Sequence, residues 1–377
     1  MSKPDQDTVF MEKALELAKK GFGRVEPNPA VGCVIVKAGR AIGTGWHRQF
    51  GGPHAEINAL ADCRRRGRDP GGSTVYISLE PCCHAGKTPP CADALIEAAP
   101  ARVVIAVGDP SPHASGKGIR RLEQAGIKVD AGTCREEAAR LNRPFLKYAS
   151  TGRCWVTVKW AQSIDGRIGW ISGGRRWISS AASRRDVHAL RRRSQAIVAG
   201  INTIRWDNPL LTARPPGRVQ PVRVVLDARM EIPIRSRLFK TIDQASVIIA
   251  AGRSEVRRER DKVQKIKDRG AEVLPLAMTV DGLDLRGLLD ELGGRGVQRV
   301  LVEGGATVIG EFLKRRLADE AVVYIAPLIL GNRGVYAEGL KRAGLSLLRE
   351  VEYSFFGEDI RITGLVSHRA AKSDEKG

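Results

Sequence analysis

Apolar positions recur along the chain with the periods of helices and of buried strands. Near the N-terminus, Met11, Ala14, Leu15 and Ala18 share the spacing of one helix face, and Asp7 stands where an N-terminal cap is expected. Short, unbroken apolar runs follow, and this pattern is typical of strands that are buried on both faces. Helical patterns separate these runs, so the sequence predicts an α/β fold with a largely buried sheet.

The pattern predicts two successive α/β units. In the first, strands are expected at 31–36, 41–46, 74–79 and 103–107, and helices at 54–66, 91–98 and 119–125. In the second, strands are expected at 196–199, 222–226, 247–251 and 299–302, and helices at 180–193, at 255–268 and after 302 to about 316. A small, polar stretch at 149–153 is the best candidate for a boundary. We therefore expect domains at 1–148 and 153–368, followed by a frayed tail at 369–377.

Length and charge refine this picture. A chain of 377 residues exceeds what one hydrophobic core usually organises, which also favours two domains. With 62 basic and 42 acidic residues, the formal net charge is +20. Such a charge favours polyanions, phosphorylated small molecules or an acidic partner, without choosing among them. The arginine runs at 64–66 and 191–193 can equally be solvated helix faces, and they lack the interleaved aromatics of single-strand binders.

The apolar runs also bear on the compartment. None approaches the roughly 18 to 20 residues that cross a bilayer, so we expect no membrane partner and a soluble, cytoplasmic protein.

The cysteines and one histidine point to metal chemistry. Three of the seven cysteines lie within ten residues, which favours a metal or catalytic cluster over a disulfide scaffold. His54, Cys82 and Cys91 supply the three protein ligands of an open zinc site. Glu56 can reach the open position without binding the metal, as a proton shuttle would. Because neighbours in an extended segment point to opposite sides, one of Cys82 and Cys83 should face the metal, and we assign Cys82. A structural zinc site would need a fourth ligand, and none is evident at a suitable spacing.

An H-x-E segment followed by P-C…C is the signature of zinc nucleobase deaminases. These usually carry C-x-x-C, whereas eight residues separate Cys82 from Cys91 here. The longer motif at 81–91, with the segments at 26–36 and 109–127, resembles the deaminase half of the bifunctional riboflavin-biosynthesis deaminase-reductases. The resemblance implies a cytidine-deaminase-like α/β/α domain. It also implies that the pyrimidine or its ribose phosphate is held by Asn28, His47, His84 and Lys87.

Motifs between Lys159 and Arg214 resemble the reductase half of the same family, an α/β domain similar to dihydrofolate reductase. The resemblance implies that NADPH lies across strand ends without a G-x-G-x-x-G fingerprint, which is missing from the sequence. Arginines suit the sugar phosphate because the guanidinium binds phosphate at two points. The resemblance places substrate contacts at Lys159, Arg175, Arg191, Leu211, Arg214 and Glu303. It places cofactor contacts at Ala161, Trp177, Thr203, Asp207, Gly305, Ala306 and Thr307.

Alternatives remain for a glycine pair, for Arg175 and for Asp165. The glycine pair at 304–305 stands between a strand and a helix, so it can cradle cofactor phosphates or can serve helix packing. Arg175 matches the family loosely and can equally be a surface arginine. Asp165 reads as a turn residue and not as a proton donor.

The resemblance as a whole implies an enzyme with two active sites. A Zn²⁺-dependent domain would remove the 2-amino group of a phosphorylated diaminopyrimidinone ribosylamine, and an NADPH-dependent domain would then reduce the ribosyl chain to ribityl. We expect phosphorylated pyrimidine substrates, a homo-oligomer and no nucleic-acid partner. A nucleic-acid editing protein is the alternative from another class; the charge suggests it, and the long C-x8-C loop and the sparse aromatics disfavour it. A third possibility is a degenerate enzyme that has lost its activity and is retained for assembly. The intact HAE and P-C…C motifs argue against it.

Overall fold

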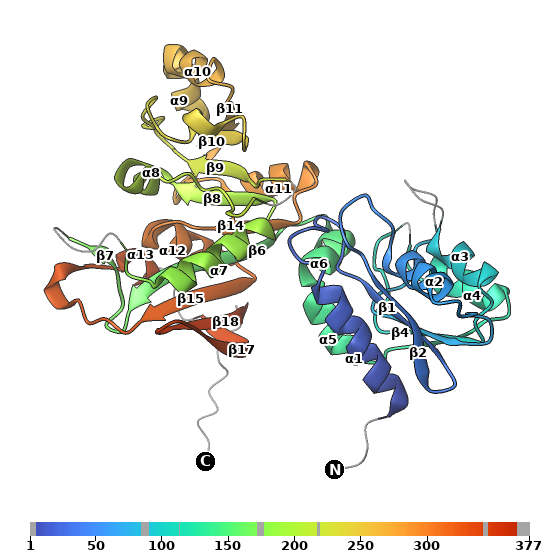
Figure 1. Ribbon diagram of the computed structural model, residues 1–377. Helices are drawn as coiled ribbons and strands as arrows, with labels where there is room; N and C mark the ends of the chain where they lie inside the picture. Colours follow the sequence, from blue (N-terminus) through green and yellow to red (C-terminus); the bar gives the residue numbers. More distant parts are fainter. Residues whose placement is uncertain are drawn as a thin grey trace, which may run out of the picture. The chain divides into compact units, whose positions relative to one another are not determined.

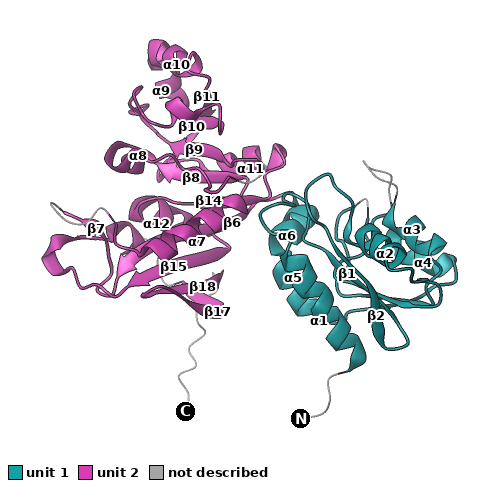
Figure 2. Ribbon diagram, viewed as in Figure 1, with its two compact units in different colours: residues 1–152 teal, residues 153–377 magenta. Residues whose placement is uncertain are grey.

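The computed structural model describes residues 5–83, 90–112, 114–171, 177–216, 219–341 and 346–367. The chain divides into two compact units, residues 1–152 and residues 153–377 (Figure 2). Within the described ranges, no helix combines the length and the apolar character that a membrane span requires.

Unit 1 is built on one five-stranded sheet in the order β2-β1-β3-β4-β5. Its strands are β1 (Gly32–Lys37), β2 (Arg40–Trp46), β3 (Thr74–Ile77), β4 (Arg102–Ile105) and β5 (Lys128–Ala131). Strand β1 runs antiparallel to β2 and β3, and β3, β4 and β5 are parallel to one another. Because the chain must cross over between parallel strands, helices connect them and cover the sheet.

In the described part of unit 1, six helices flank this sheet (Figure 1). They are α1 (Gln6–Lys19), α2 (Ala55–Arg65), α3 (Cys91–Glu97), α4 (Lys117–Gln124), α5 (Arg135–Leu141) and α6 (Arg143–Thr151). Helices α2, α3 and α4 bury Ala59, Leu95 and Leu122 in the core on one face of the sheet. Helices α1 and α5 contribute Met11 and Ala138 to the core on the other face. The unit is therefore a three-layer α/β/α sandwich, as the family resemblance implies.

Unit 1 also contains β5, α5 and α6, which the pattern did not predict, and its first helix begins differently from the prediction. The N-cap of α1 is Asp5, not Asp7. Asp7 lies inside the first turn, where its carboxylate accepts hydrogen bonds from Arg102 and Tyr76 and is therefore not available to cap. The division between the two units falls at residue 152, inside the polar stretch at 149–153, and α6 continues to Thr151. The Ser150 hydroxyl donates to the Leu146 carbonyl at 2.8 Å, one turn back, which accommodates this polar residue in a helix.

Unit 2 is built on a nine-stranded sheet in the order β11-β10-β9-β8-β14-β6-β15-β18-β17. Its strands are β6 (Trp155–Ser163), β8 (Ala196–Gly200), β9 (Val222–Leu226), β10 (Val247–Gly252), β11 (Glu272–Leu276), β14 (Arg299–Val302), β15 (Glu320–Ala326), β17 (Leu347–Phe356) and β18 (Asp359–Ser367). The last two strands form an antiparallel edge, and the other neighbours are parallel. Two small sheets pair β7 (Arg167–Trp170) with β16 (Gly334–Tyr336), and β12 (Met278–Thr279) with β13 (Gly282–Leu283).

Helices cover both faces of this sheet as well. They are α7 (Ala181–Arg192), α8 (Ile201–Asp207), α9 (Arg253–Arg258), α10 (Arg260–Lys267), α11 (Leu285–Gly294), α12 (Ala306–Lys314) and α13 (Glu338–Lys341), with short 3-10 turns η1 (Phe239–Thr241) and η2 (Gly331–Arg333). Helices α11 and α12 bury Leu288 and Phe312 on one face, whereas α8 and α10 bury Ile204 and Ile266 on the other. The predicted helix at 255–268 is interrupted, because Glu259, at φ −93° and ψ 43°, leaves the helical conformation.

Candidate active sites

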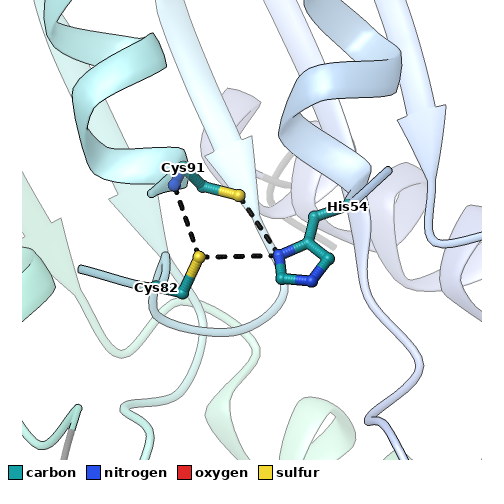
Figure 3. Close-up of side chains that lie close together, drawn as sticks. All are labelled: His54, Cys82 and Cys91. Atoms are coloured by element: carbon teal, nitrogen blue, oxygen red, sulfur yellow. Dashed lines mark hydrogen bonds between the residues drawn. The ribbon is translucent and has the colours of Figure 1, made fainter. Parts of the chain in front are cut away.

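In unit 1, one imidazole and two thiols converge on a single point (Figure 3). The ligand atoms of His54, Cys82 and Cys91 all lie within 4.8 Å of one another. His54 Nδ1 is 3.5 Å from the Cys82 sulfur and 3.2 Å from the Cys91 sulfur. Such a set of nitrogen and thiolate donors is what zinc prefers, and three ligands leave a position open. The residues present therefore fit a catalytic zinc ion.

The fold places these three side chains at element ends. His54 is the N-cap of α2 and Cys91 is the first residue of α3, while Cys82 lies in the loop after β3. The backbone N–H of Cys91 donates to the Cys82 sulfur at 3.3 Å, and the N–H of Ala92 donates to the Cys82 carbonyl at 3.1 Å. Free N–H groups at a helix start stabilise negative charge, so this placement favours a thiolate at Cys82.

The electrostatics of the cluster agree with this geometry. Hydrogen bonding from Cys91 lowers the pKa of the Cys82 thiol well below its usual range. The hydrogen bond to Cys82 raises the pKa of His54. Burial raises the pKa of Glu56 to about 7, and its side chain in the first turn of α2 is only 3% exposed. A carboxyl with such a pKa exchanges protons readily near neutral pH.

Two further residues of the predicted deaminase site lie beside the cluster as a pair. The ring of His47 stands edge-on to that of His54, with the centroids 5.2 Å apart. His47 Nδ1 is 3.1 Å from the Pro53 carbonyl, so it carries the proton, and Nε2 accepts from the Asn28 amide at 3.2 Å. Burial lowers the pKa of His47, which favours the neutral ring.

The structure does not place the remaining candidates of unit 1 at this site. Among the described residues, Cys83 is not part of the group that could hold a metal. His84 and Lys87 lie outside the described residues.

Unit 2 contains a cavity of about 1050 Å³ at the ends of its parallel strands. Eleven of the positions predicted for substrate or cofactor line it: Lys159, Ala161, Trp177, Arg191, Thr203, Asp207, Leu211, Arg214, Glu303, Gly305 and Ala306. Thr307 lies in the first turn of α12 but is not among the described residues that line the cavity. Arg175 lies outside the described residues.

A buried ion pair forms part of the wall of this cavity. Arg191 of α7 donates to both oxygens of Glu303, which follows β14, and also to the Thr212 carbonyl at 3.0 Å. Burial would raise the pKa of Glu303, but the charges of Arg191 and Lys159 outweigh it and hold that pKa below its ordinary value. Burial lowers the pKa of Lys159. The cavity carries an excess of positive charge, because its described lining holds five basic residues and two acidic ones: Lys159, Arg184, Arg191, Arg214 and Arg237 against Asp207 and Glu303.

The glycine turn after β14 also faces this cavity. Glu303 and the glycine pair Gly304 and Gly305 separate the end of β14 from Ala306, where α12 begins. Gly305 is the N-cap of α12, with φ −67° and ψ 171°. A Cβ placed on Gly305 would meet no atom within 4 Å, so open space adjoins this backbone. Free N–H groups at a helix start can receive a phosphate there.

Sequence reasoning missed several residues that line the same cavity: Trp160, Arg184, His188, Trp206 and Arg237. His188 Nδ1 is 3.2 Å from the Thr212 carbonyl, and burial lowers the pKa of its ring. Its place one helix turn before Arg191 is a signal that could have found it, because residues three apart share a helix face. Trp206 is 85% exposed at the end of α8, and no pattern in the sequence marked it.

Comparison with known proteins places both units in families. The family described as "Cytidine and deoxycytidylate deaminase zinc-binding region" matches residues 4–107. The family described as "RibD C-terminal domain" matches residues 154–362. The fold and the sites therefore define a two-domain enzyme that joins a zinc-dependent deaminase to a reductase.

Relatives match over nearly the whole chain. The riboflavin biosynthesis protein RibD of Aquifex aeolicus is 41% identical over 349 residues, which are 92% of this chain and 92% of the relative. That of Escherichia coli is 39% identical over 340 residues, covering 87% and 89% of the two chains. The solved structure of Acinetobacter baumannii RibD is 36% identical, with a TM-score of 0.81, and the match covers 96% of this chain and 99% of that one.

The chain belongs to the RibD family of riboflavin-biosynthesis proteins. It is thus a bifunctional deaminase and reductase, and these domains imply Zn²⁺ and NADPH as cofactors. The predicted family, fold class, enzyme class and cofactors are confirmed.

Proposed function

We propose that unit 1 hydrolyses the 2-amino group of 2,5-diamino-6-ribosylamino-4(3H)-pyrimidinone 5′-phosphate and that unit 2 reduces the ribosyl chain of the product to ribityl. The observation that carries this proposal is the convergence of His54, Cys82 and Cys91 in a chain that also holds a cation-lined cavity. A relative of known structure, from Thermotoga maritima, is described as a diaminohydroxyphosphoribosylaminopyrimidine deaminase and 5-amino-6-(5-phosphoribosylamino)uracil reductase. It is 35% identical, with a TM-score of 0.80 and coverage of 96% and 99% of the two chains.

In unit 1, His54, Cys82 and Cys91 would hold the zinc ion. When bound, zinc supplies the Lewis acidity that makes water a nucleophile near neutral pH. Glu56 takes a proton from the attacking water and gives it to the departing amino group, a role for which its burial and raised pKa suit it. The Asn28–His47 pair, with the neutral imidazole fixed by the Pro53 carbonyl, lies beside the metal ligands and orients the pyrimidine. His84 and Lys87 complete the proposed substrate contacts.

In unit 2, the cavity would hold both the sugar phosphate and the cofactor. NADPH supplies the hydride when bound. Arg191, fixed by Glu303, and Arg214 bind the phosphorylated chain, and Lys159 donates to an oxygen of the substrate. Leu211 packs against the substrate, and Arg175 is a further proposed contact. Cofactor contacts are proposed at Ala161, Trp177, Thr203, Asp207, Gly305, Ala306 and Thr307.

The experiment that tests this function measures two activities on one purified chain. Ammonia release from the diamino substrate reports unit 1, and NADPH oxidation with the deaminated compound reports unit 2. Metal analysis should find one zinc ion per chain. A chain that releases ammonia but does not oxidise NADPH would contradict the reductase half of the proposal, and the reverse result would contradict the deaminase half.

We also propose that the protein is a cytoplasmic homo-oligomer with no nucleic-acid partner. The edge strand β17 exposes Tyr353 (69%) and Phe355 (75%), beside Ile360 of β18 (36%). An apolar patch along an unpaired strand edge favours association with another chain. Light scattering of the purified protein and of a Phe355→Ser variant tests this. Filter binding with single-stranded DNA and RNA at two salt concentrations tests the absence of a nucleic-acid partner.

A further inference from the structure

We infer that Glu80 is a positioning residue for the metal site. Its buried carboxylate fastens the segment of Pro81 and Cys82 to the start of α4, and this fixes the Cys82 sulfur where it faces His54 and Cys91. The inference deepens the proposed function and rests on it in one respect, because it takes Cys82 as a zinc ligand.

The Glu80 side chain is only 5% exposed, and it accepts four backbone hydrogen bonds. Oε1 accepts from the N–H of Gly118 at 3.0 Å and from that of Ile119 at 3.4 Å. Oε2 accepts from the N–H groups of Asp109 and Gly116, each at 3.1 Å. One side chain thus gathers the loop between β4 and α4 together with the first turn of α4.

Only a carboxylate satisfies this arrangement. An ionised carboxylate offers two oxygens that accept and no hydrogen that donates, which matches donors on both sides. Its negative charge also lies at the N-terminus of α4, where the free N–H groups of the helix favour an anion. A glutamine of the same shape would turn its NH₂ group toward two N–H donors, and buried donors without an acceptor are costly.

Glu80 acts on the metal site through the backbone that follows it. The Glu80 N–H donates to the Val107 carbonyl at 2.9 Å, which ties the segment after β3 to the segment after β4. A Cβ placed on Gly118 would lie 2.2 Å from the Pro81 carbonyl oxygen, so α4 packs directly on the residue before Cys82. Cys82 itself is held from the other side by the N–H groups of Cys91 and Ala92.

Cys82 is therefore fixed between the starts of two helices. The start of α3 contacts it directly, and the start of α4 holds it through Pro81 and Glu80. Among the described residues, Glu80 is not a member of the group that could bind a metal. Its effect on zinc must pass through the position of Cys82, because outer partners of metal ligands orient those ligands.

The test compares three variants of the full-length, zinc-loaded protein. Glu80→Gln removes one acceptor oxygen and keeps the shape. Gly118→Ala pushes α4 from Pro81 and leaves every charge in place. Glu123→Gln, on an exposed position of α4, is the matched control. The measured quantity is the rate at which zinc passes to a coloured chelator. Reductase activity of the same chain reports that the rest of the protein is folded.

Changes to such outer partners typically cost 10- to 100-fold in metal affinity. We therefore expect zinc loss to be at least about tenfold faster in Glu80→Gln and also faster in Gly118→Ala. The control should lose zinc at the wild-type rate. Excess zinc should restore deaminase kcat in Glu80→Gln with KM unchanged, because all three ligands remain. Zinc loss at the wild-type rate in Glu80→Gln, or a lower kcat that excess zinc does not restore, would overturn the inference. Should Glu80→Gln fail to fold, a wild-type rate in Gly118→Ala overturns it. A wild-type chain that never holds zinc would refute the proposed metal site itself.

Discussion

The Arg191 guanidinium and the Glu303 carboxylate form a two-point ion pair, with Nε to Oε1 at 2.6 Å and Nη2 to Oε2 at 2.7 Å. The two residues are 112 positions apart in the chain. Their side chains are 12% and 9% exposed, so both charges lie in the wall of the reductase cavity and are little screened by water. The pair holds the arginine in one orientation before any ligand arrives, and such preorganisation strengthens binding.

From this geometry we expect Glu303→Gln to lower reductase kcat/KM by roughly 10- to 100-fold, because a charged hydrogen bond is lost and Arg191 can turn away. Ammonia release should stay near the wild-type rate. The measurement is NADPH oxidation with the deaminated substrate. The control is the same assay on Glu338→Gln, which changes an exposed carboxylate of the same unit. A Glu303→Gln enzyme with wild-type kcat/KM would show that the pair serves stability alone.

The sequence predicted those parts of the sites that are local in the chain. His54 and Glu56 stand two residues apart at a helix start, and Cys82 and Cys91 lie in one motif, so spacing and ligand chemistry were sufficient to group them. The fold adds relations that spacing does not show. Nothing near Arg191 in the sequence indicates that β14 brings Glu303 to it, and nothing near Glu80 indicates that the loop before α4 folds around its carboxylate.

The strands were likewise predicted only where the signal in the sequence is local. Buried strands such as β8 and β10 were predicted closely, because all of their residues are buried and the apolar run is continuous. The edge strands β17 and β18 were not predicted. All ten residues of β17 are exposed or half-buried, and its exposed side chains are both polar and apolar, so the strand shows neither an apolar run nor a clean alternation.

Gly305 allows a test of the proposed cofactor cradle. Its φ of −67° suits any residue, and an added Cβ would meet no protein atom within 4 Å. Because alanine caps a helix less well than glycine, Gly305→Ala should lower the Tm by no more than about 4 °C, while its methyl group crowds a phosphate bound at the start of α12. We expect KM for NADPH to rise by about tenfold or more, an effect of the size of one lost charged hydrogen bond.

The control for this variant is Gly294→Ala, at the end of α11, where an added Cβ also meets nothing. It should leave KM unchanged and should not lower the Tm, because alanine favours a helix more than glycine does. If Gly305→Ala bound NADPH as tightly as the wild type in isothermal titration, the phosphates would have to lie elsewhere in the cavity.

The adjacent cysteines give a second matched pair. Cys82 lies within the group of His54 and Cys91, and Cys83 does not. Because the thiolate is the form that binds zinc and a serine hydroxyl does not ionise near neutral pH, Cys82→Ser should lose zinc and ammonia release. Cys83→Ser should keep one zinc ion per chain and near wild-type deaminase activity. Metal analysis of the two variants decides the assignment, and zinc retained in Cys82→Ser but lost in Cys83→Ser would reverse it.

The final prediction concerns the independence of the two activities. Glu56 lies in unit 1 and Glu303 in unit 2, and the residues proposed for each reaction lie on one side of the division at residue 152. Glu56→Gln keeps the size of the side chain but cannot carry a proton between water and the leaving amine. Because proton transfer by a positioned group typically contributes about 10² to 10⁴-fold, ammonia release should fall by that order. The same variant should oxidise NADPH at the wild-type rate when it receives the deaminated substrate, and metal analysis should still find zinc, since its three proposed ligands are unchanged.

Circular dichroism confirms that the variant is folded. A folded Glu56→Gln protein that lost both activities on their own substrates would contradict two separate sites and would require one site, or two that depend on each other.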